Sequence, residues 1–248
     1  MYNFFYPEYQ AKIGNNIITE AIQLEILFDK NTSFDWAQIN FTINLFTAIG
    51  IKKDDEFSLS IGYDGGLEEV FTGYVTDMQG STVTIKNEML KLARVLITNS
   101  FVSSIPQEVV TFILEKAGVT EYELSKEAYS IKKLLNISKV SGIEALKIVD
   151  KAFNITPSIG IFKCKKFEWN VTTKQDKVYN FIYAENIINL ECISPKTWEL
   201  STIAVPFIKV LSKVNVQHPS VSGDFIVDKI KININENGFI RTKLIFKE

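Results

Sequence analysis

Apolar and polar residues alternate through much of the first ninety positions of this chain, and this alternation restricts what the chain can fold into. The clearest run is residues 37–45, where every second residue from Ala37 to Leu45 is apolar. Residues 20–28 and 57–63 repeat the pattern. Because successive side chains of a strand point to opposite faces, each run predicts a half-buried strand of an antiparallel sheet.

Residues that tolerate a positive φ lie between these runs. Gly14-Asn15-Asn16, Asp64-Gly65-Gly66 and Gln79-Gly80-Ser81 each separate two apolar segments. Such residues close tight turns, so we expect hairpins at all three places. Six or so short strands at this spacing are typical of a β-sandwich or a small β-barrel.

The period changes near residue 100, where the sequence predicts helices. Ser104 precedes an apolar stripe that ends at Gly118, and we expect its side chain to cap the helix by accepting from the backbone of Gln107. Ser141 and Glu144 form a second capping box, which opens a helix that ends at Asn154. Residues 129–140 fit either a short helix or an extended strand.

The strand pattern returns after Pro157. Residues 159–171 and 179–190 read as extended segments, residues 221–224 as a turn, and Asn237-Gly238 as a two-residue primed turn in a terminal hairpin. The expected fold class is therefore mainly β with an α insertion. It comprises two small antiparallel β-barrel or sandwich domains, residues 1–95 and 158–248, separated by a helical subdomain at 96–157.

Composition excludes several function classes. The net charge is −2 and Arg94 and Arg241 are the only arginines, so we expect no nucleic-acid specificity. Residues 1–7 lack the pattern of a signal peptide, and no apolar run reaches the ~20 residues of a spanning helix, so we expect neither export nor membrane insertion.

Residues that could carry chemistry are few. His218 is the single histidine, and without partners at ligand spacing it reads as a loop residue. Cys164 and Cys192 form no CxxC pair, so we interpret them as buried free thiols in a reduced compartment. Aromatic residues make up 12% of the chain, and many fall on core positions of strands, which favours core filling over a binding face.

Carboxylates cluster at residues 54–56 and again at Asp64, Glu68 and Glu69. Their spacing matches neither a calcium loop nor a glycosidase pair, and the glycines at 62–66 precede no helix that could bind phosphate. We therefore expect no catalytic residue, no metal ligand and no cofactor.

Read in order, these segments resemble the baseplate hub proteins of contractile phage tails, whose N-terminal half is shared with late-control and valine-glycine-repeat spike proteins. The resemblance spans nearly the whole chain. It is carried by the segments at 9–17, 36–45, 55–66 with 70–75, 141–153 and 219–227, and by the hairpin at Asn237-Gly238.

The resemblance implies a structural role without catalysis. Family members are homotrimers whose subunits each contribute two tail-tube-like β domains, so that a pseudo-sixfold ring joins a hexameric tail tube to a trimeric spike. The partners it implies are the tube or a distal tube protein, a separate spike protein, and baseplate wedge and tape-measure proteins. The implied location is the tail or baseplate of a virion or phage-like injection particle, assembled in the bacterial cytoplasm.

Two other functions remain open from the sequence. A β domain of this kind could bind a host glycan or peptide through the loop at residues 64–69. A peptidoglycan hydrolase that uses Glu68 or Asp55 is the other alternative.

Overall fold

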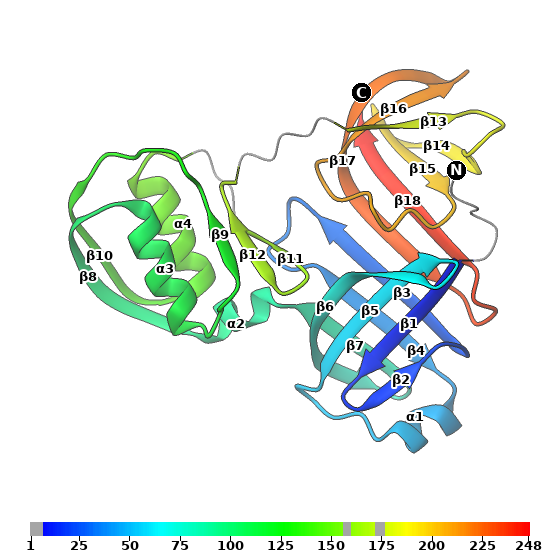
Figure 1. The fold of residues 1–248 in the computed structure, drawn as a ribbon, viewed down its shortest axis with the longest axis horizontal. Coiled ribbons are helices and arrows are strands. Elements are labelled where there is room, and N and C mark those ends of the chain that lie inside the picture. Colours follow the sequence, from blue (N-terminus) through cyan, green and yellow to red (C-terminus); the bar gives the residue numbers. More distant parts are fainter. Residues whose placement is uncertain (1–6, 156–159, 172–176) are drawn as a thin grey trace. The chain divides into compact units, whose positions relative to one another are not determined.

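The computed structural model describes residues 7–155, 160–171 and 177–248. The protein is mainly β, with antiparallel sheets and a few short helices, as the sequence predicts (Figure 1). The chain divides into two compact units. The β unit contains residues 1–86 and 174–248, and the helical unit contains residues 87–173.

The first half of the β unit is built from seven strands in the order β3-β4-β7-β6-β5-β1-β2. Their bounds are β1 (Pro7–Ile13), β2 (Asn16–Ile18), β3 (Ile22–Asp29), β4 (Trp36–Phe41), β5 (Glu56–Tyr63), β6 (Gly66–Gln79) and β7 (Thr82–Asn87). The expected turn at Asp64-Gly65 is confirmed, since φ is 52° at Asp64 and 76° at Gly65, both in the left-handed region. We call these strands the first repeat.

One strand prediction is wrong at its end. The alternating run does not continue to Leu45, because β4 ends at Phe41 and helix α1 (Ile43–Ile49) follows. Leu45, Phe46 and Ile49 have helical spacing and pack against the core, and Gly50 ends the helix with a φ of 65°. A period-two pattern over a few residues thus gave the wrong element where the apolar residues also fit a helix.

The second half of the β unit has six strands in the order β13-β16-β17-β18-β15-β14. Their bounds are β13 (Val178–Ile182), β14 (Asn189–Ser194), β15 (Thr197–Thr202), β16 (Lys213–His218), β17 (Val221–Ile234) and β18 (Ile240–Lys247). We call these strands the second repeat.

Three predictions in the second repeat are wrong in detail. Residues 179–190 are not one extended segment, because they turn between β13 and β14. Residues 221–224 lie inside β17, whose hairpin with β16 turns at Pro219 and Ser220. Gly238 has a positive φ but Asn237 does not, so the terminal turn is a longer loop in which the Asn235 amide donates to the Phe239 carbonyl at 3.1 Å.

The two repeats have the same strand order. β3, β4, β5, β6 and β7 of the first correspond to β14, β15, β16, β17 and β18 of the second, in sequence as well as in the sheet. β2 directly precedes β3 in sequence, as β13 directly precedes β14. β13 pairs parallel with β16. β2 also runs parallel to β5, because β1 lies between them and is antiparallel to both. β1 is therefore an additional strand of the first repeat.

A local feature fixes this correspondence. The Asp54 amide donates to the Val75 carbonyl at 2.9 Å and the Val75 amide to the Asp55 carbonyl at 3.0 Å. In the second repeat the Leu211 amide donates to the Val227 carbonyl at 2.8 Å and the Val227 amide to Ser212 at 3.0 Å. Asp54 and Leu211 both have a φ of 70°. The same kink thus leads into β5 and into β16.

The repeats share one sheet and one core. β17 pairs with β3 through six residues, from Lys229 opposite Asp29 to Ile234 opposite Leu24, and we call this junction the seam. Buried side chains on both sides of the seam belong to a single hydrophobic cluster. The repeats therefore do not have separate cores.

Within its described residues, the helical unit contains two small sheets and three helices. The elements are α2 (Met89–Arg94), β8 (Leu96–Ser104), α3 (Pro106–Lys116), β9 (Tyr122–Leu124), β10 (Lys132–Ser141), α4 (Gly142–Ala152), β11 (Ile161–Lys163) and β12 (Lys166–Trp169). β10 pairs with β8, so the segment left open by the sequence is a strand.

One of the two helix caps is as predicted. Ser141 accepts from the Glu144 amide at 3.2 Å and opens α4. In α3 the cap lies one residue later than predicted, because Pro106 takes the first helical position and the Ile105 amide donates to the Glu108 side chain at 3.1 Å. The predicted partner of Gln107, the Ser104 hydroxyl, is instead buried.

Candidate functional site

The residues that could carry chemistry make contacts that are typical of residues with a structural role. His218 ends β16, its Nδ1 accepts from the Ser220 amide at 3.1 Å, and its ring packs edge-on against Tyr183. Cys164 is half-buried and Cys192 is exposed, so the expectation of buried thiols is wrong.

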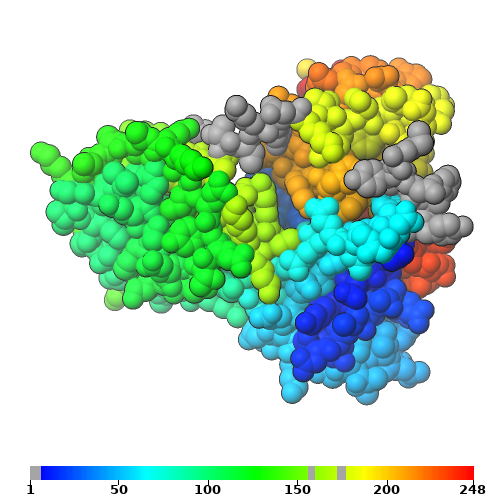
Figure 2. Space-filling model, in the orientation of Figure 1, coloured from blue at the N-terminus to red at the C-terminus, as the bar shows by residue number. Residues whose placement is uncertain are grey.

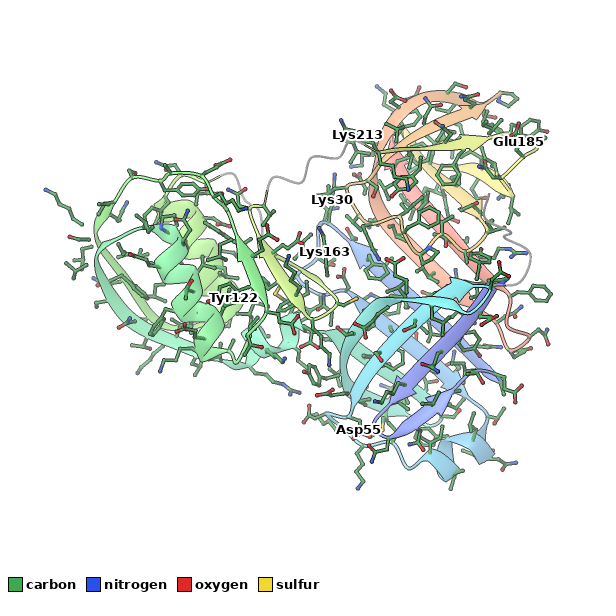
Figure 3. The ribbon with its side chains drawn as sticks, in the orientation of Figure 1. Lys30, Asp55, Tyr122, Lys163, Glu185 and Lys213 are labelled. Carbon is green, nitrogen blue, oxygen red and sulfur yellow. The ribbon has the colours of Figure 1, made fainter. Side chains whose placement is uncertain are left out.

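The carboxylates lie at opposite ends of one hairpin. Asp55, labelled in Figure 3, precedes β5, and its side chain accepts from the Lys52 amide at 2.8 Å. Asp64 forms the turn at the far end, where Glu68 faces Ile61 across the hairpin. Within residues 7–155, 160–171 and 177–248, no group of acidic, histidine and cysteine side chains is arranged to bind a metal ion. Asp55 and Glu68 cannot act on one bond from these positions.

Ion pairs cross the seam on its polar face. Lys229 contacts Asp29 at 2.7 Å, and Lys231 contacts Glu25 at 2.7 Å. Lys30, labelled in Figure 3, follows β3 and contacts Asp228 at 2.5 Å. In each of the first two pairs the acid belongs to β3 and the lysine to β17. The seam therefore has a charge pattern that matches these two edges.

Asp29 is held in its charged form. Burial acts to raise its pKa, but hydrogen bonds from Lys229 and Asn31 outweigh burial, and the pKa lies below its ordinary value. A carboxyl group whose pKa is lower in the folded state stabilises the fold above its ordinary pKa and loses that contribution as the pH falls. Acid thus weakens the seam.

A polar hollow of ≈ 590 Å³ lies beside the seam. Its lining residues are Gln23, Leu24, Glu25, Gln38, Asn40, Asn233, Ile234, Asn235, Phe239 and Arg241. Uncharged amides dominate this lining, and its two charges have opposite sign. The lining thus mixes apolar side chains, such as Phe239, with uncharged amides, and it has no strong net charge.

A second contact ties the repeats together. The Tyr63 hydroxyl at the end of β5 donates to the Ala204 carbonyl of the second repeat at 2.7 Å. Burial raises the pKa of Tyr63 to about 12, and the nearby Arg241 acts in the opposite direction. Tyr63 therefore remains a hydrogen-bond donor at physiological pH.

Three strands of the large sheet, β2, β13 and β14, pair with only one other strand among the described residues. Five of the six residues of β14 are exposed, and Ile193 within it is 47% exposed. The nearby Tyr183 and Ile188 are 56% and 52% exposed. Figure 2 shows part of this segment in yellow at the surface. An open edge with exposed apolar side chains is a site for association with another chain.

Comparison with known proteins identifies the fold. The structure matches the 43 kDa tail protein of prophage MuSo2 from Shewanella oneidensis with a TM-score of 0.71 and 12% identity, over 96% of each chain. It matches a tail protein from Neisseria meningitidis MC58 with a TM-score of 0.74 and 9% identity, over 98% of this chain and 97% of that one. The chain has the fold of phage tail proteins.

The same fold occurs in a secretion system. The E. coli c3393 protein, a type VI secretion component described as structurally similar to bacteriophage T4 tail proteins, matches with a TM-score of 0.64 and 9% identity, over 96% of this chain and 76% of that one. No protein-family model matches the sequence, and no curated protein matches it. The resemblance drawn from the sequence is thus confirmed as a phage tail fold.

Two features of this tail fold, the seam and the open edge of β14, were not predicted from the sequence. The one signal for the seam is the length of β17, whose apolar residues alternate to Ile234, well beyond the end of its pairing with β16. No local pattern could show that β3 lies beside it, because the two strands are about two hundred positions apart.

The helical unit of this tail fold holds a buried carboxyl group. Asp150 on α4 is 3% exposed, and Trp169 Nε1 donates to its Oδ1 at 3.2 Å. Burial raises the pKa of Asp150 to about 6, and the Trp169 hydrogen bond acts in the opposite direction.

No helix among the described residues is long and apolar enough to cross a membrane.

Proposed function

We propose that this protein is a structural hub of a phage tail or phage-derived contractile injection particle. In this role three copies form a ring that joins a hexameric tail tube to a trimeric spike. The observation that carries the proposal is the shared strand order of the two repeats, which gives one chain two similar β elements. Three such chains present six similar elements to a sixfold tube and keep threefold symmetry for a spike.

The arrangement of the chain supports this proposal. The two tube-like domains expected at residues 1–95 and 158–248 then correspond to the two repeats of the β unit, and the insertion expected at 96–157 corresponds to the helical unit, residues 87–173. The helical unit lies in sequence between the two repeats, and it contributes no strand to the large sheet. The repeats can therefore form a ring element while the insertion contacts other components, such as wedge or tape-measure proteins.

The proposed role is not enzymatic. The carboxylates that a hydrolase would need lie at opposite ends of the β5–β6 hairpin, and the hollow beside the seam lacks a pair of carboxylates on either side of a bond. We place the protein in the tail or baseplate of the particle, after assembly in the host cytoplasm.

Native mass spectrometry and negative-stain imaging test the hub role. The protein is measured alone over a range of concentrations, and then with the tube and spike proteins encoded beside it. We expect a trimer that binds both partners, one on each side. A protein that stays monomeric at high concentration and with both partners present would overturn the proposal.

A further inference from the structure

The seam inside the chain is a template for a second seam between chains. At the seam, β3 of the first repeat pairs with β17 of the second. The strand that corresponds to β3 is β14, and the strand that corresponds to β17 is β6. If the corresponding strands pair in the same way, β14 lies beside β6 of another copy.

Both of these edges are open. β14 ends the strand order, and its outer side has no neighbour among the described strands. β6 has only β5 and β7 as neighbours, and its pairing on the β5 side stops at Val75. On β17, by contrast, the backbone beyond the corresponding Val227 pairs with β3. Residues 76–79 of β6 thus occupy the position that receives a strand in the second repeat.

We propose that β14 of one copy pairs antiparallel with residues 76–79 of β6 in the next copy. This inference rests on the proposed trimeric hub and names the surface that holds it together. The contact is head-to-tail, so each copy uses its β14 edge on one side and its β6 edge on the other. Three such contacts close a ring.

The seam also predicts which residues face each other. Lys229, two residues after Val227, faces Asp29, the last residue of β3, and Lys231 faces Leu27. Two residues after Val75 is Asp77, which then faces Ser194, the last residue of β14. β14 has a register shift between Cys192 and Ser194 that β3 lacks, so the predicted register rests on the Asp77–Ser194 pair.

The charges at the two seams differ. At the internal seam the lysines belong to β17 and the acids to β3, whereas Asp77 puts an acid on β6 where Lys229 stands on β17, and β14 itself carries the acid Glu191. The nearest cation on the other side is Lys196, exposed in the turn after β14, much as Lys30 follows β3 and contacts β17. An Asp77–Lys196 pair between copies has the sign that attracts.

The new seam is shorter than the internal one. β17 continues to Ile234, whereas β6 ends at Gln79 and turns at Gly80. Exposed apolar residues near β14, such as Ile193, add to the contact. Because few backbone pairs form, we expect the trimer to dissociate on dilution.

Reversing the charges tests the pairing. We would measure the trimer dissociation by analytical ultracentrifugation for wild type, Asp77→Lys, Lys196→Glu and the double variant. We expect each single variant to weaken the trimer by about tenfold and the double variant to recover most of the loss, because a close charge pair couples by about 1.5 kcal/mol or more. Lys12→Glu, an exposed charge on β1, is the control and should leave the trimer unchanged.

The outcomes separate the two proposals. A wild-type trimer that none of the Asp77 and Lys196 variants weakens would overturn the β14–β6 pairing and leave the hub role intact. A wild-type protein that does not trimerise, even with tube and spike present, would overturn both. Both positions are exposed, so unchanged melting temperatures should show that the variants fold.

A cross-link tests the register directly. With Cys164 and Cys192 replaced by serine, Asp77→Cys is combined with Ser194→Cys and the protein is oxidised. We expect bands of two and three linked chains on a denaturing gel, since directly opposite residues have Cβ atoms about 4.5–5.5 Å apart. Ser194→Cys without Asp77→Cys, or with Lys12→Cys instead, should not link. An equally efficient link through Lys12→Cys would contradict the proposed register.

Discussion

The two repeats of the β unit share strand order and the kink before the β5-type strand, but they differ at their edges. The first repeat has the additional strand β1 and helix α1. The second has a longer β17–β18 hairpin, and its strand β17 pairs with β3. The shared parts are those that build the common core. The edges differ in their neighbours. β3 and β17 pair with each other inside the chain, whereas β14 and the end of β6 have no such pairing among the described residues of a single copy.

This difference fixes the order of the repeats in the proposed ring. If both seams were identical, the order of repeats around the ring would not be defined, and strands of different copies could exchange. β17 already pairs with β3 inside each copy, so in the proposed ring β6 of the next copy is the partner left for β14. A head-to-tail ring of fixed order follows from that pairing.

The largest expected effect tests whether the repeats unfold together. Phe246→Ala on β18 removes a fully buried ring stacked on Phe225, and Ile85→Ala on β7 truncates a fully buried side chain in the corresponding strand. We expect losses of about 3–5 and 2–5 kcal/mol in the free energy of unfolding. Because the core is continuous, both variants should shift the same urea transition of the β unit.

Two probes check this expectation. Near-ultraviolet circular dichroism follows the loss of aromatic packing in the whole protein, and hydrogen exchange with mass spectrometry reports each repeat separately. Ile17→Ala, at an exposed position of β2, is the control and should have little effect. If Phe246→Ala opened only the second repeat and left exchange in the first unchanged, the comparison would have to treat the repeats as independent domains.

A smaller effect separates the repeats from the helical unit. Asp150→Asn should stabilise the helical unit by about 1 kcal/mol at pH 7 and have little effect at pH 4.5, because burial penalises only the ionised carboxyl group. Between about pH 4 and 6 the folded state holds this proton and the unfolded state has released it, so the contribution of Asp150 to stability falls as the pH rises. Acid acts on Asp29 at the seam in the opposite direction.

Thermal unfolding, monitored through hydrogen exchange of the α4 amides, measures this effect at both pH values. Glu144→Gln, on the exposed side of the same helix, is the control and should not show the same pH dependence. Identical pH profiles for wild type and Asp150→Asn would mean that the buried carboxyl group is not the cause.

The smallest effect compares the two kinks. Leu211 and Asp54 both have a φ of 70°, which a leucine adopts less readily than an aspartate. Leu211→Gly should raise the free energy of unfolding by about 1 kcal/mol, and Asp54→Gly should raise it by less. Urea unfolding measures both, and Leu211→Asn should follow the glycine variant in direction. A larger gain at Asp54 than at Leu211 would contradict the equivalence of the kinks.

Much of the secondary structure could be predicted from local sequence. Alternation found β3, β5 and the terminal hairpin, and Ser141 marked the start of α4, because period and capping depend on residues a few positions apart. The same local rules failed at Leu45 and at residues 221–224. In both places a short apolar or turn-like stretch fits two elements, and packing against the core decides between them.

The candidate site was less predictable than the fold. The sequence singled out His218, the two cysteines and two carboxylate clusters, but it did not point to Asp77, Lys196 or the edge of β14. An isolated exposed charge has no signature in a sequence. It gains meaning only when the strand beside it is known.

By itself the sequence determined that the chain forms two sets of antiparallel strands around a helical insertion, because periodicity and turn chemistry act over a few residues. Only the tertiary structure decided that the two sets share one order, one core and one seam, and that a matching pair of edges is left open. Strand pairing depends on contacts between residues far apart in the chain, and those contacts are fixed by burial of the whole core and not by local preference.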